Sequence, residues 1–376
     1  MPPRHPDRVG GVDKGVEPTL VIDYSLFMPR KSEGAQKATI RDVARKAKVS
    51  TATVSRVLAG GTVVSEPLAA RVRAVAKQLR YQPNRVARSL RSQKSHIVGV
   101  LIPNIQNPFF TGVIRGIEDL LQATDYTLLL GNSDDNPARE RNYLELLKAE
   151  GVAGLIVVPG QDAAKTYNET LSLEIPLVAI DRFVADLPCD SVTVANEEGA
   201  AAAIRHLLAL GHKRIAIATG PENISTARDR LTGYTRALQA ARISPDPALI
   251  HHGVFRQEGG YEAALKFISL PSPPTAIFTA SDFIALGVLR ALHDRRVQIP
   301  RQIAMVSFDD MPWAAALSPP LTAVAQPTYE LGATAARLLL ARMRDGELPL
   351  QRVQLQTQLV VRASCGAPWP AALNEK

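Results

Sequence analysis

Several features that place proteins in other classes are scarce or absent from this sequence. Its 376 residues include only two cysteines, Cys189 and Cys365, too few for a disulfide framework or a cysteine-based metal site. No apolar run approaches the roughly 20 residues that a membrane-spanning helix needs. The N-terminus lacks the charged start and continuous apolar core of a secretory signal. We therefore expect a cytoplasmic protein with no metal, no cofactor and no membrane partner.

Motifs of catalysis are also missing. The sequence contains no HExxH, no GxSxG and no P-loop, and no Ser/His/Asp grouping has the spacing of a catalytic site. The hypothesis of an enzyme is therefore disfavoured, and we predict no catalytic residues.

The positive charge is confined to one part of the chain. Residues 38–95 contain 13 Lys and Arg against 2 Asp and Glu, whereas residues 96–376 contain 25 against 29. Cationic side chains that neutralise phosphates release condensed counterions, and this release drives binding to DNA. The charge distribution therefore assigns nucleic-acid binding to residues 38–95 and gives the remainder no reason to bind DNA.

The segment Thr39–Leu58, TIRDVARKAKVSTATVSRVL, has the pattern of two short helices joined by a tight turn. Thr39 and Asp42 form a capping-box pattern that predicts a helix start, and Ser50 is a good N-cap for a second helix over residues 51–58. The second helix has outward side chains that suit a major groove, namely Thr51, Ala52, Thr53, Ser55 and Arg56. Two ordinary surface helices of a larger helical domain are the alternative.

Two further helices are predicted after this segment. Ser65 can cap a third helix, which has Pro67 in its first turn and a buried stripe formed by Leu68, Val72, Val75, Ala76 and Leu79. We expect Pro83 to stop this helix and Asn84 to cap one further short helix. A helix of that length is marginal alone because nucleation is costly, so it should need DNA or a second chain to form.

Residues 39–90 resemble the DNA-binding head and hinge of the lactose-repressor (LacI/GalR) family of bacterial transcription regulators. The resemblance rests on DVARKAKVSTATVSRVL followed by YQPNRVARSL. It implies that Thr51, Ala52 and Arg56 read base edges in the major groove and that Thr53 contacts a phosphate or a base. Ala52 would make an apolar contact, for example to a thymine methyl group.

The same resemblance implies contacts for the hinge. Leu90 corresponds to an apolar wedge that relatives insert into the minor groove, with Ala87 beside it and Arg91 reaching along the groove. Unstacking two base pairs costs a few kcal/mol, which the contacts allowed by the bent duplex recover. Residues 1–37, rich in Pro, Gly and charge, are expected to be mostly disordered, and they depart from the family pattern.

From residue 96 onward the pattern predicts alternating strands and helices. Continuous apolar strands between amphipathic helices indicate parallel sheets covered on both faces, in two α/β units of similar size. The crevice between two such units, outside the carboxyl ends of the strands, is the default ligand site. The predicted strands are 96–103, 126–130, 154–158, 177–180, 215–219, 276–279 and 304–307, and the predicted helices are 108–123, 137–149, 197–210, 227–241 and 283–295.

The resemblance to the LacI/GalR family extends through residue 368, with landmarks such as PNIQNPFF and PTAIFTASDFIALG. It implies two Rossmann-like parallel α/β subdomains of the type I periplasmic-binding-protein fold, in a homodimer that binds a near-palindromic operator. It also places crossings between the lobes near Val194, Ala325 and Leu348. The predicted domains are a disordered extension (1–37), a helix-turn-helix domain (38–83), a hinge helix and linker (84–95), and a core (96–376) with lobes 96–194 plus 326–347 and 195–324 plus 348–376.

Candidate ligand residues come from strand ends and helix starts. Phe109 and Phe110 could present an aromatic face to a ring, with core packing as the alternative. Each charged candidate could instead be a solvated loop charge or a helix cap, and Asp282 in particular has the position of an N-cap. The charged candidates are Asp181, Arg182, Arg230, Asp282 and Asp309. The resemblance implies that the effector contacts Phe109, Asp181, Arg230, Phe255, Asp282 and Asp309.

These residue types favour one class of ligand. Carboxylates and an arginine that bond paired hydroxyls, with aromatics on the flat faces, suit a sugar or sugar derivative, and a purine-like ring is the alternative. The sequence thus predicts a DNA-binding transcription regulator, with repression as the expected mode, controlled by a small-molecule effector between two lobes. A sugar-binding transport receptor is disfavoured by the missing export signal and the basic head.

Overall fold

The computed structural model describes residues 38–58, 64–81, 96–160, 164, 166–168 and 175–367. The chain divides into two compact units, residues 1–91 and 92–376. The predictions for residues 1–37 and for Ala87, Leu90 and Arg91 lie outside the described residues.

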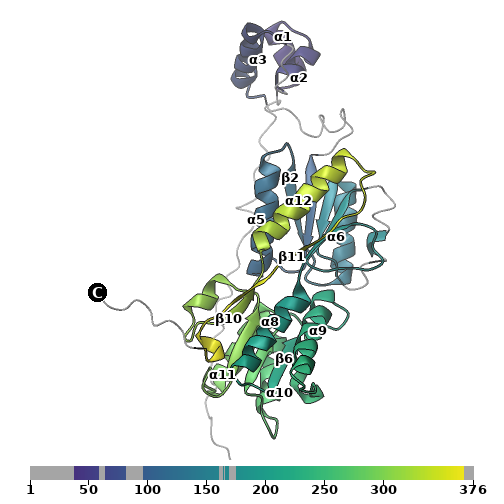
Figure 1. The fold of residues 1–376 in the computed structure, drawn as a ribbon. Helices are drawn as coiled ribbons and strands as arrows, with labels where there is room; N and C mark the ends of the chain where they lie inside the picture. Colours follow the sequence, from purple (N-terminus) through teal and green to yellow (C-terminus); the bar gives the residue numbers. More distant parts are fainter. Residues whose placement is uncertain are drawn as a thin grey trace, which may run out of the picture. The chain divides into compact units, whose positions relative to one another are not determined.

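The described part of the first unit is a head of three helices, α1 (Ile40–Ala47), α2 (Thr51–Leu58) and α3 (Glu66–Gln78) (Figure 1). Valine and alanine side chains from all three helices form its small core, which is the packing that the helical spacing predicted. Such short helices gain most of their stability from this shared core.

All three predicted helix starts in the head are confirmed, two of them with a capping hydrogen bond through the N-cap side chain. The Thr39 N–H donates to Asp42 Oδ2 at 3.0 Å and the Asp42 N–H donates to Thr39 Oγ1 at 3.4 Å, which completes the capping box of α1. The Ser50 hydroxyl accepts from the Thr53 N–H at 3.1 Å and caps α2. Ser65 occupies the N-cap position of α3, as predicted, but its side chain makes no capping hydrogen bond.

The helix ends in the head depend on two residues with left-handed backbone. Lys48 has φ 52°, and the Val49 N–H donates back to the Ala44 carbonyl at 3.0 Å, which turns the chain from α1 into α2. Arg80 has φ 49°, and the Tyr81 N–H donates to the Ala76 carbonyl at 2.9 Å. This second motif ends α3 at Gln78, before the proline that was expected to stop it.

The second unit contains two six-stranded sheets, one in each lobe. The first lobe has the strand order β11-β5-β4-β3-β1-β2, and all neighbouring strands are parallel. Its strands are β1 (Ile97–Ile102), β2 (Thr127–Asn132), β3 (Gly154–Val157), β4 (Leu177–Ile180), β5 (Asp190–Val194) and β11 (Arg352–Leu355).

The second lobe repeats this order as β12-β10-β9-β8-β6-β7. Its edge strand β12 is antiparallel to β10, so the prediction of wholly parallel sheets fails at this strand. Its strands are β6 (Ile215–Thr219), β7 (Ile250–His252), β8 (Ala276–Thr279), β9 (Ala304–Phe308), β10 (Thr322–Ala325) and β12 (Gln358–Val360).

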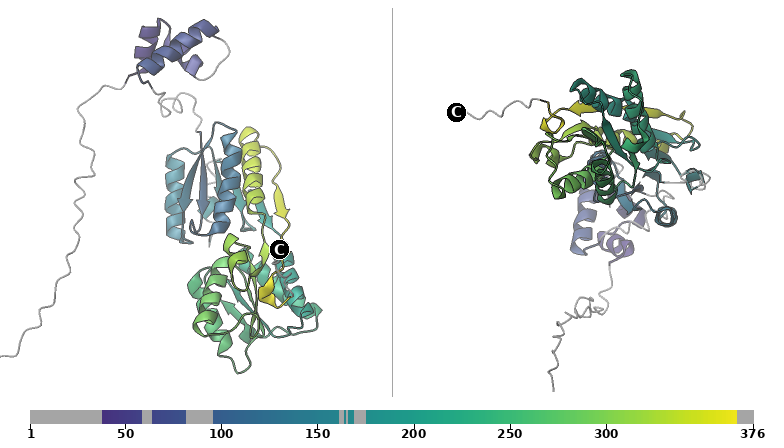
Figure 2. Two further views of the ribbon diagram at one scale, coloured as in Figure 1. Left: turned by 90° about the vertical axis from the view of Figure 1, so that its left-hand side faces the viewer. Right: turned by 90° about the horizontal axis from the view of Figure 1, so that it is seen from below.

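Helices cover both faces of each sheet (Figure 2). In the first lobe α5 (Pro108–Gln122) and α12 (Thr328–Arg344) pack on one face and α6 (Pro137–Ala149) on the other. In the second lobe the paired helices are α8 (Asn196–Ala209) with α9 (Ser225–Ala240), and α10 (Gln257–Ile268) with α11 (Asp282–Asp294). None of the described helices has both the length and the apolar character needed to cross a membrane.

A glycine allows the closest helix contact in the first lobe. A Cβ atom on Gly332 of α12 would lie 1.9 Å from the carbonyl oxygen of Val113 on α5, so only glycine fits there. The close packing joins α12, which comes from the C-terminal part of the chain, to a helix near the start of the core. The first lobe is therefore complete only when the chain has returned from the second lobe.

The chain crosses between the lobes three times, after β5, after β10 and after β11. The first two crossings follow Val194 and Ala325. The third follows Leu355, not Leu348, because β11 still belongs to the first lobe, where Val353 pairs with Val192 of β5. The predicted boundary at residues 347 and 348 is therefore wrong by the length of one edge strand and the turn before it.

Candidate functional site

The outward face of α2 carries the side chains that the sequence assigned to base reading. Val54 and Val57 are buried in the head, whereas Ala52 and Arg56 are exposed and Thr51 and Thr53 are half-buried. The Thr53 hydroxyl lies 2.9 Å from the Ser50 hydroxyl, so part of its hydrogen-bonding capacity is already used by the cap of α2. The exposed groups of this face are thus the methyl group of Ala52 and the guanidinium of Arg56. A methyl group suits an apolar contact in a groove, and a guanidinium suits a base edge or a phosphate.

The second unit has a pocket between its two lobes, outside the carboxyl ends of both sets of strands. Every ligand residue predicted from the sequence lines this pocket except Asp282. The lining residues are Pro103, Asn104, Asn107, Phe109, Phe110, Asp135, Asp181, Arg182, Thr226, Arg230, Phe255, Arg256, Ser281, Asp309 and Gln326. Among the described residues, no group of three or more His, Cys, Asp or Glu side chains is placed to hold a metal ion.

Asp181 and Arg182 follow β4 at the floor of the pocket, and both are almost fully buried. Asp181 has left-handed backbone, with φ 64°, and the Arg182 N–H donates to the Ile180 carbonyl across it at 2.6 Å. Such a tight three-residue turn is strained, and strain of this kind is concentrated at functional sites. Burial raises the pKa of Asp181 to about 6, although Arg182 and Arg230 act to lower it.

Arg182 is anchored by Asp135, a residue that was not predicted from the sequence. Its Nη1 donates to Asp135 Oδ1 at 2.6 Å and to the Pro159 carbonyl at 3.3 Å. Its Nε lies 3.9 Å from Asp181 Oδ2. The guanidinium is therefore fixed at one end, and its Nε edge faces the Asp181 carboxylate.

Arg230, buried in α9, connects three parts of the second lobe. Its Nε donates to Asn196 Oδ1 at 2.8 Å and its Nη1 donates to the Ala280 carbonyl at 2.6 Å. Its guanidinium carbon lies 3.7 Å above the ring of Phe308. Arg230 thus links Asn196, just after the first crossing between the lobes, to Ala280 at the end of β8.

Asp282 and Asp309 form a pair of buried carboxylates at the second lobe's side of the pocket. Burial and the neighbouring Asp309 raise the pKa of Asp282 to about 7, and burial also raises the pKa of Asp309. Gln326 Nε2 donates to Asp309 Oδ1, and Asn107 Nδ2 donates to Asp282 Oδ1 across the cleft at 3.2 Å. Because two interacting buried carboxylates cannot both ionise without cost, the pair favours the state in which they share one proton.

The position of Asp282 corrects one interpretation of the sequence. Ser281, not Asp282, is the N-cap of α11, and its hydroxyl accepts from the Ile284 N–H at 3.3 Å. Asp282 is the first residue of the helix, where its carboxylate interacts favourably with the helix dipole. Its side chain points to Asn107 of the other lobe, so it belongs to the lobe interface behind the pocket wall.

The aromatic candidates lie on both lobes. Phe109 and Phe110 meet edge to face, with ring centroids 4.9 Å apart, and both are largely buried. Each of them packs in the first lobe's core and also lines the pocket, so core packing is confirmed and the ligand contact stays a prediction. In the second lobe Phe255 lies over Gly220 at the end of β6, where a Cβ atom would come within 2.3 Å of the ring. Only glycine at that strand end allows the ring to line the pocket.

Three buried polar atoms in and beside the pocket have no hydrogen-bond partner among the described residues. They are Arg182 Nε, Asp282 Oδ2 and Gln326 Oε1, one donor and two acceptors. An unpaired buried polar group costs about 1–3 kcal/mol, and native proteins rarely keep several together. Arg182 and Gln326 line the pocket, whereas Asp282 lies beside it, so the described lining of the pocket has one unpaired buried donor and one unpaired buried acceptor. This pair indicates a site for a small ligand that offers both donors and acceptors.

Sequence reasoning missed Asn107, Asp135 and Gln326. Asn107 had a local signal, because it precedes Pro108 and accepts from the Phe109 N–H at 2.8 Å as the N-cap of α5. Asp135 and Gln326 had none, because each meets its partner only after distant segments have come together.

Two family models match the chain. A model of bacterial regulatory proteins of the lacI family covers residues 39–84, and a model of a periplasmic binding protein-like domain covers residues 204–365. The transcriptional regulator RegA of Clostridium saccharobutylicum is 36% identical over 327 residues, which cover 87% of this chain and 98% of that protein. The ribose operon repressor of Halalkalibacterium halodurans is 37% identical over 325 residues, or 86% and 96%.

Solved structures agree with this assignment. The lac repressor dimer bound to operator and the anti-inducer ONPF has a TM-score of 0.79 at 27% identity, over 88% of this chain and 99% of that one. The CelR regulator in complex with cellobiose has a TM-score of 0.66 at 29% identity, over 87% and 99%. A regulator from Enterococcus faecium with bound ribose has a TM-score of 0.65 at 31% identity, over 71% and 98%.

A helix-turn-helix head joined to a core of the periplasmic-binding-protein type defines a DNA-binding transcription regulator with a ligand-binding domain. The chain belongs to the lacI family of bacterial regulatory proteins. The family resemblance read from the sequence is thus confirmed.

Proposed function

We propose that this regulator is a repressor whose affinity for a near-palindromic operator is set by a neutral monosaccharide bound between the two lobes. The observation that carries the proposal is that Arg182 Nε and Gln326 Oε1, two buried atoms without a hydrogen-bond partner in the described part of the chain, belong to residues that line the pocket beside aromatic rings. Sugar hydroxyls both donate and accept, so one ring can satisfy such a set.

The charge of the pocket supports a neutral ligand. The pocket is lined by equal numbers of carboxylates (Asp135, Asp181 and Asp309) and guanidinium groups (Arg182, Arg230 and Arg256). All three guanidinium groups already donate to protein oxygens, and among their atoms only Arg182 Nε is buried without a hydrogen-bond partner from the described residues, so a phosphate would find few donors that are not already used. The site therefore disfavours sugar phosphates.

D-Ribose is the first compound to test. One relative with 37% identity is a ribose operon repressor, and one solved regulator with 31% identity holds ribose. A flat purine, the alternative, would leave several of the hydroxyl-binding groups without partners. We infer that ligand exerts its effect by binding one arrangement of the lobes more tightly than the other, in a homodimer whose two heads contact the operator.

A ligand screen tests the effector. D-Ribose at saturating concentration should raise the melting temperature by several degrees, because ligand at about 100 times its Kd adds about 2.7 kcal/mol. Ribose 5-phosphate and hypoxanthine serve as controls and should have little effect. If no monosaccharide raises the melting temperature, or if the phosphate is equally effective, the proposed ligand class is wrong.

The DNA-binding assignment has a separate test. Arg56→Ala should weaken binding to a selected operator about 10- to 100-fold, as expected for loss of one base contact. Arg205→Ala, which removes an exposed arginine paired with Glu198 on α8, is the matched control and should bind normally. Leu90→Ala should weaken specific binding far more than nonspecific binding, and an equal loss in both would contradict the wedge assignment.

A further inference from the structure

The lobe crossings and the residue Arg256 lie at opposite edges of the cleft. The crossings leave from β5, β10 and β11, at one edge of each sheet, whereas β2 and β7 form the other edge. Four or five strand spacings separate these edges, or roughly 20 Å. A contact beyond β2 and β7 therefore lies farthest from the crossings, where it resists an opening rotation of the lobes most effectively.

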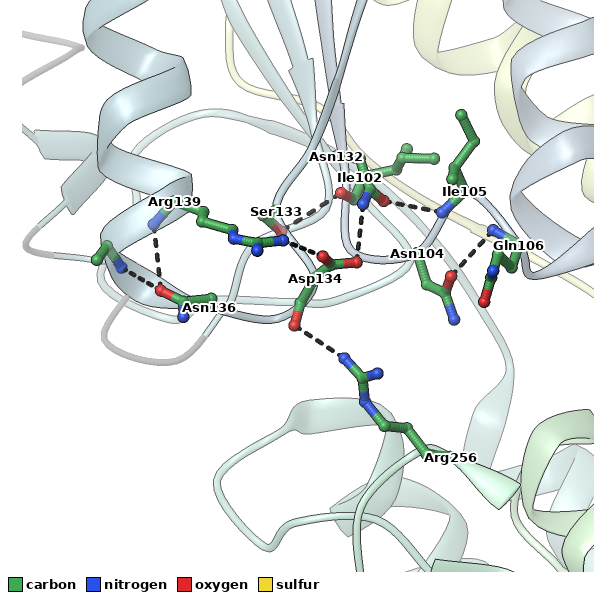
Figure 3. Close-up of polar contacts among 11 residues, drawn as sticks. Ile102, Asn104, Ile105, Gln106, Asn132, Ser133, Asp134, Asn136, Arg139 and Arg256 are labelled. Carbon is green, nitrogen blue, oxygen red and sulfur yellow. Dashed lines mark hydrogen bonds and ion pairs between the residues drawn. The ribbon is translucent and has the colours of Figure 1, made fainter. Parts of the chain in front are cut away.

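Arg256 makes such a contact. It lies between β7 and α10, and its Nη2 donates to the backbone carbonyl of Asp134, which follows β2, at 3.2 Å. Figure 3 shows Arg256 reaching from the second lobe to this carbonyl. Arg256 also lines the pocket, so its guanidinium lies where the pocket meets solvent.

The turn that offers the carbonyl is held in an unfavourable conformation. Asp134 and Asp135 both have φ 54°, and two successive left-handed residues other than glycine are rare. The Asp134 carboxylate accepts from Asn132 Nδ2 at 2.8 Å and pairs with Arg139, which fixes the turn against β2 and α6 (Figure 3). The conformation aims the Asp134 carbonyl at the second lobe.

The same turn connects to the floor of the pocket. The Asp135 carboxylate accepts from Arg182, whose unpaired Nε is one of the candidate ligand donors. One short segment thus carries the anchor of a ligand-binding arginine and the acceptor for Arg256. Closure at the rim and the position of Arg182 are therefore mechanically linked.

We propose that Arg256 is a latch that closes the open edge of the cleft and restricts the site to ligands of a single ring. With the Arg256–Asp134 bond in place, the guanidinium occupies the direction in which a second ring would leave the pocket. The bond joins a flexible side chain to a backbone carbonyl, so it can break and re-form as ligand exchanges. The inference rests on the proposed monosaccharide site and names what limits the size of its ligand.

The test compares a monosaccharide with probes that carry a second ring system, by isothermal titration for affinity and by stopped-flow measurement for release. The probes are D-ribose, adenosine and cellobiose, and the proteins are the wild type, Arg256→Ala and the control Arg290→Ala, which removes an exposed arginine on α11 paired with Asp294. Arg256→Ala should bind adenosine or cellobiose at least about tenfold more tightly than the wild type does, and should release D-ribose about tenfold faster. Arg290→Ala should match the wild type.

Asp134→Asn separates the latch carbonyl from the side chain beside it. The substitution keeps the backbone acceptor and a residue type that tolerates left-handed backbone but removes the ion pair with Arg139, so it should relax the size limit less than Arg256→Ala does. If Arg256→Ala shows the same probe preference and release rate as the wild type, the latch is wrong.

Hydrogen exchange distinguishes this failure from failure of the monosaccharide proposal. In the ligand-free protein, Arg256→Ala should speed exchange at residues 133–136 and 254–257, and Arg290→Ala should not. If no probe binds any variant, the proposed ligand class fails while this comparison still decides the latch. Unchanged exchange in Arg256→Ala would overturn it.

Discussion

Asp181 of the first lobe and Asp309 of the second lobe occupy equivalent places in two sheets of the same order. Asp181 follows β4 with φ 64°, and Asp309 follows β9 with φ 74°. The Asp181 N–H donates to the Val192 carbonyl of the neighbouring strand, and the Asp309 N–H donates to the Val324 carbonyl, both at 2.9 Å. Each carboxyl also has a raised pKa caused first by burial. The fold therefore presents one strained, buried aspartate from each lobe to the cleft.

The arginines beside these aspartates differ. Arg182 is anchored by the partly exposed Asp135 and keeps Nε unpaired, whereas Arg230 binds Asn196 and Ala280 and stacks on Phe308. The first lobe thus offers a donor to the ligand, and the second lobe uses its arginine to hold its own frame. The two aspartates are equivalent, but their arginines come from different places, Arg182 from the end of β4 and Arg230 from α9, and they have separate roles, one in recognition and one in structure.

The largest expected effect is on stability. Arg230→Gln should lower the free energy of unfolding by about 3 kcal/mol or more, because it leaves buried acceptors and carboxylates without their cation. Arg182→Gln should cost about half as much, since Asp135 can be hydrated. Urea unfolding of the ligand-free proteins measures both, and equal losses would contradict the division of roles.

A second effect concerns recognition. Asp181→Asn should weaken D-ribose binding by about 100-fold, and Asp309→Asn should weaken it by about 10-fold. The difference is expected because the Asp309 carboxylate already accepts hydrogen bonds from Gln326 and from the Asp282 N–H. Titration calorimetry measures the two affinities. The reverse order would show that the second lobe, not the first, supplies the main acceptor.

The affinity for D-ribose should also depend on pH. The carboxylate accepts sugar hydroxyls only when ionised, and burial raises the pKa of Asp181 to about 6. Affinity should therefore fall as pH decreases through 6, by about tenfold from pH 7.5 to pH 5. Asp181→Asn should flatten this profile, and a wild-type affinity that is constant over the range would exclude Asp181 as an ionised acceptor.

The smallest predicted effect is a pH-dependent change in stability. The pKa of Asp282 is about 7 in the folded protein and near 3.8 when unfolded, so the folded state binds the extra proton and this residue's contribution becomes unfavourable as pH rises through that window. Asp282→Asn removes the ionisation and should stabilise the protein by on the order of 1 kcal/mol at pH 8. At pH 3.5, below that window, it should have little effect.

Melting temperatures of Asp282→Asn and the wild type at the two pH values check this expectation. Asp310, which pairs with Arg362 at 2.7 Å, provides a matched control. Asp310→Asn should destabilise at pH 8, because it breaks an ion pair. Stabilisation by both substitutions would show that the effect is not specific to the cleft.

Prediction of the fold succeeded where burial is continuous. The strands 177–180, 215–219 and 276–279 and the helix 137–149 have the bounds expected from their apolar patterns. The missed strands β5, β7, β10, β11 and β12 have shorter or interrupted apolar runs. At the sheet edges, for example, alternate residues of RVQL in β11 are exposed, and none of the residues of IHH in β7 is fully buried. An edge strand has a short and mixed pattern because only one side of it is covered.

The pocket follows the same division. The Asp and Arg candidates at strand ends could be predicted, because parallel strands bring their carboxyl ends to one edge. Asp135 and Gln326 could not, because their roles depend on Arg182 and Asp309, which are distant in the sequence. The same is true of Arg256, whose partner carbonyl lies 122 residues away.

The amino-acid order alone determined the head, the alternating α/β pattern and the family, because helix caps, apolar periodicity and short motifs act within a few residues. Only the tertiary structure decided which polar atoms remain unpaired in the cleft, which arginine is free for a ligand, and where the third crossing lies. Those properties depend on burial and on partners from separate segments, and neither exists before the two sheets have folded and the chain has returned to the first lobe.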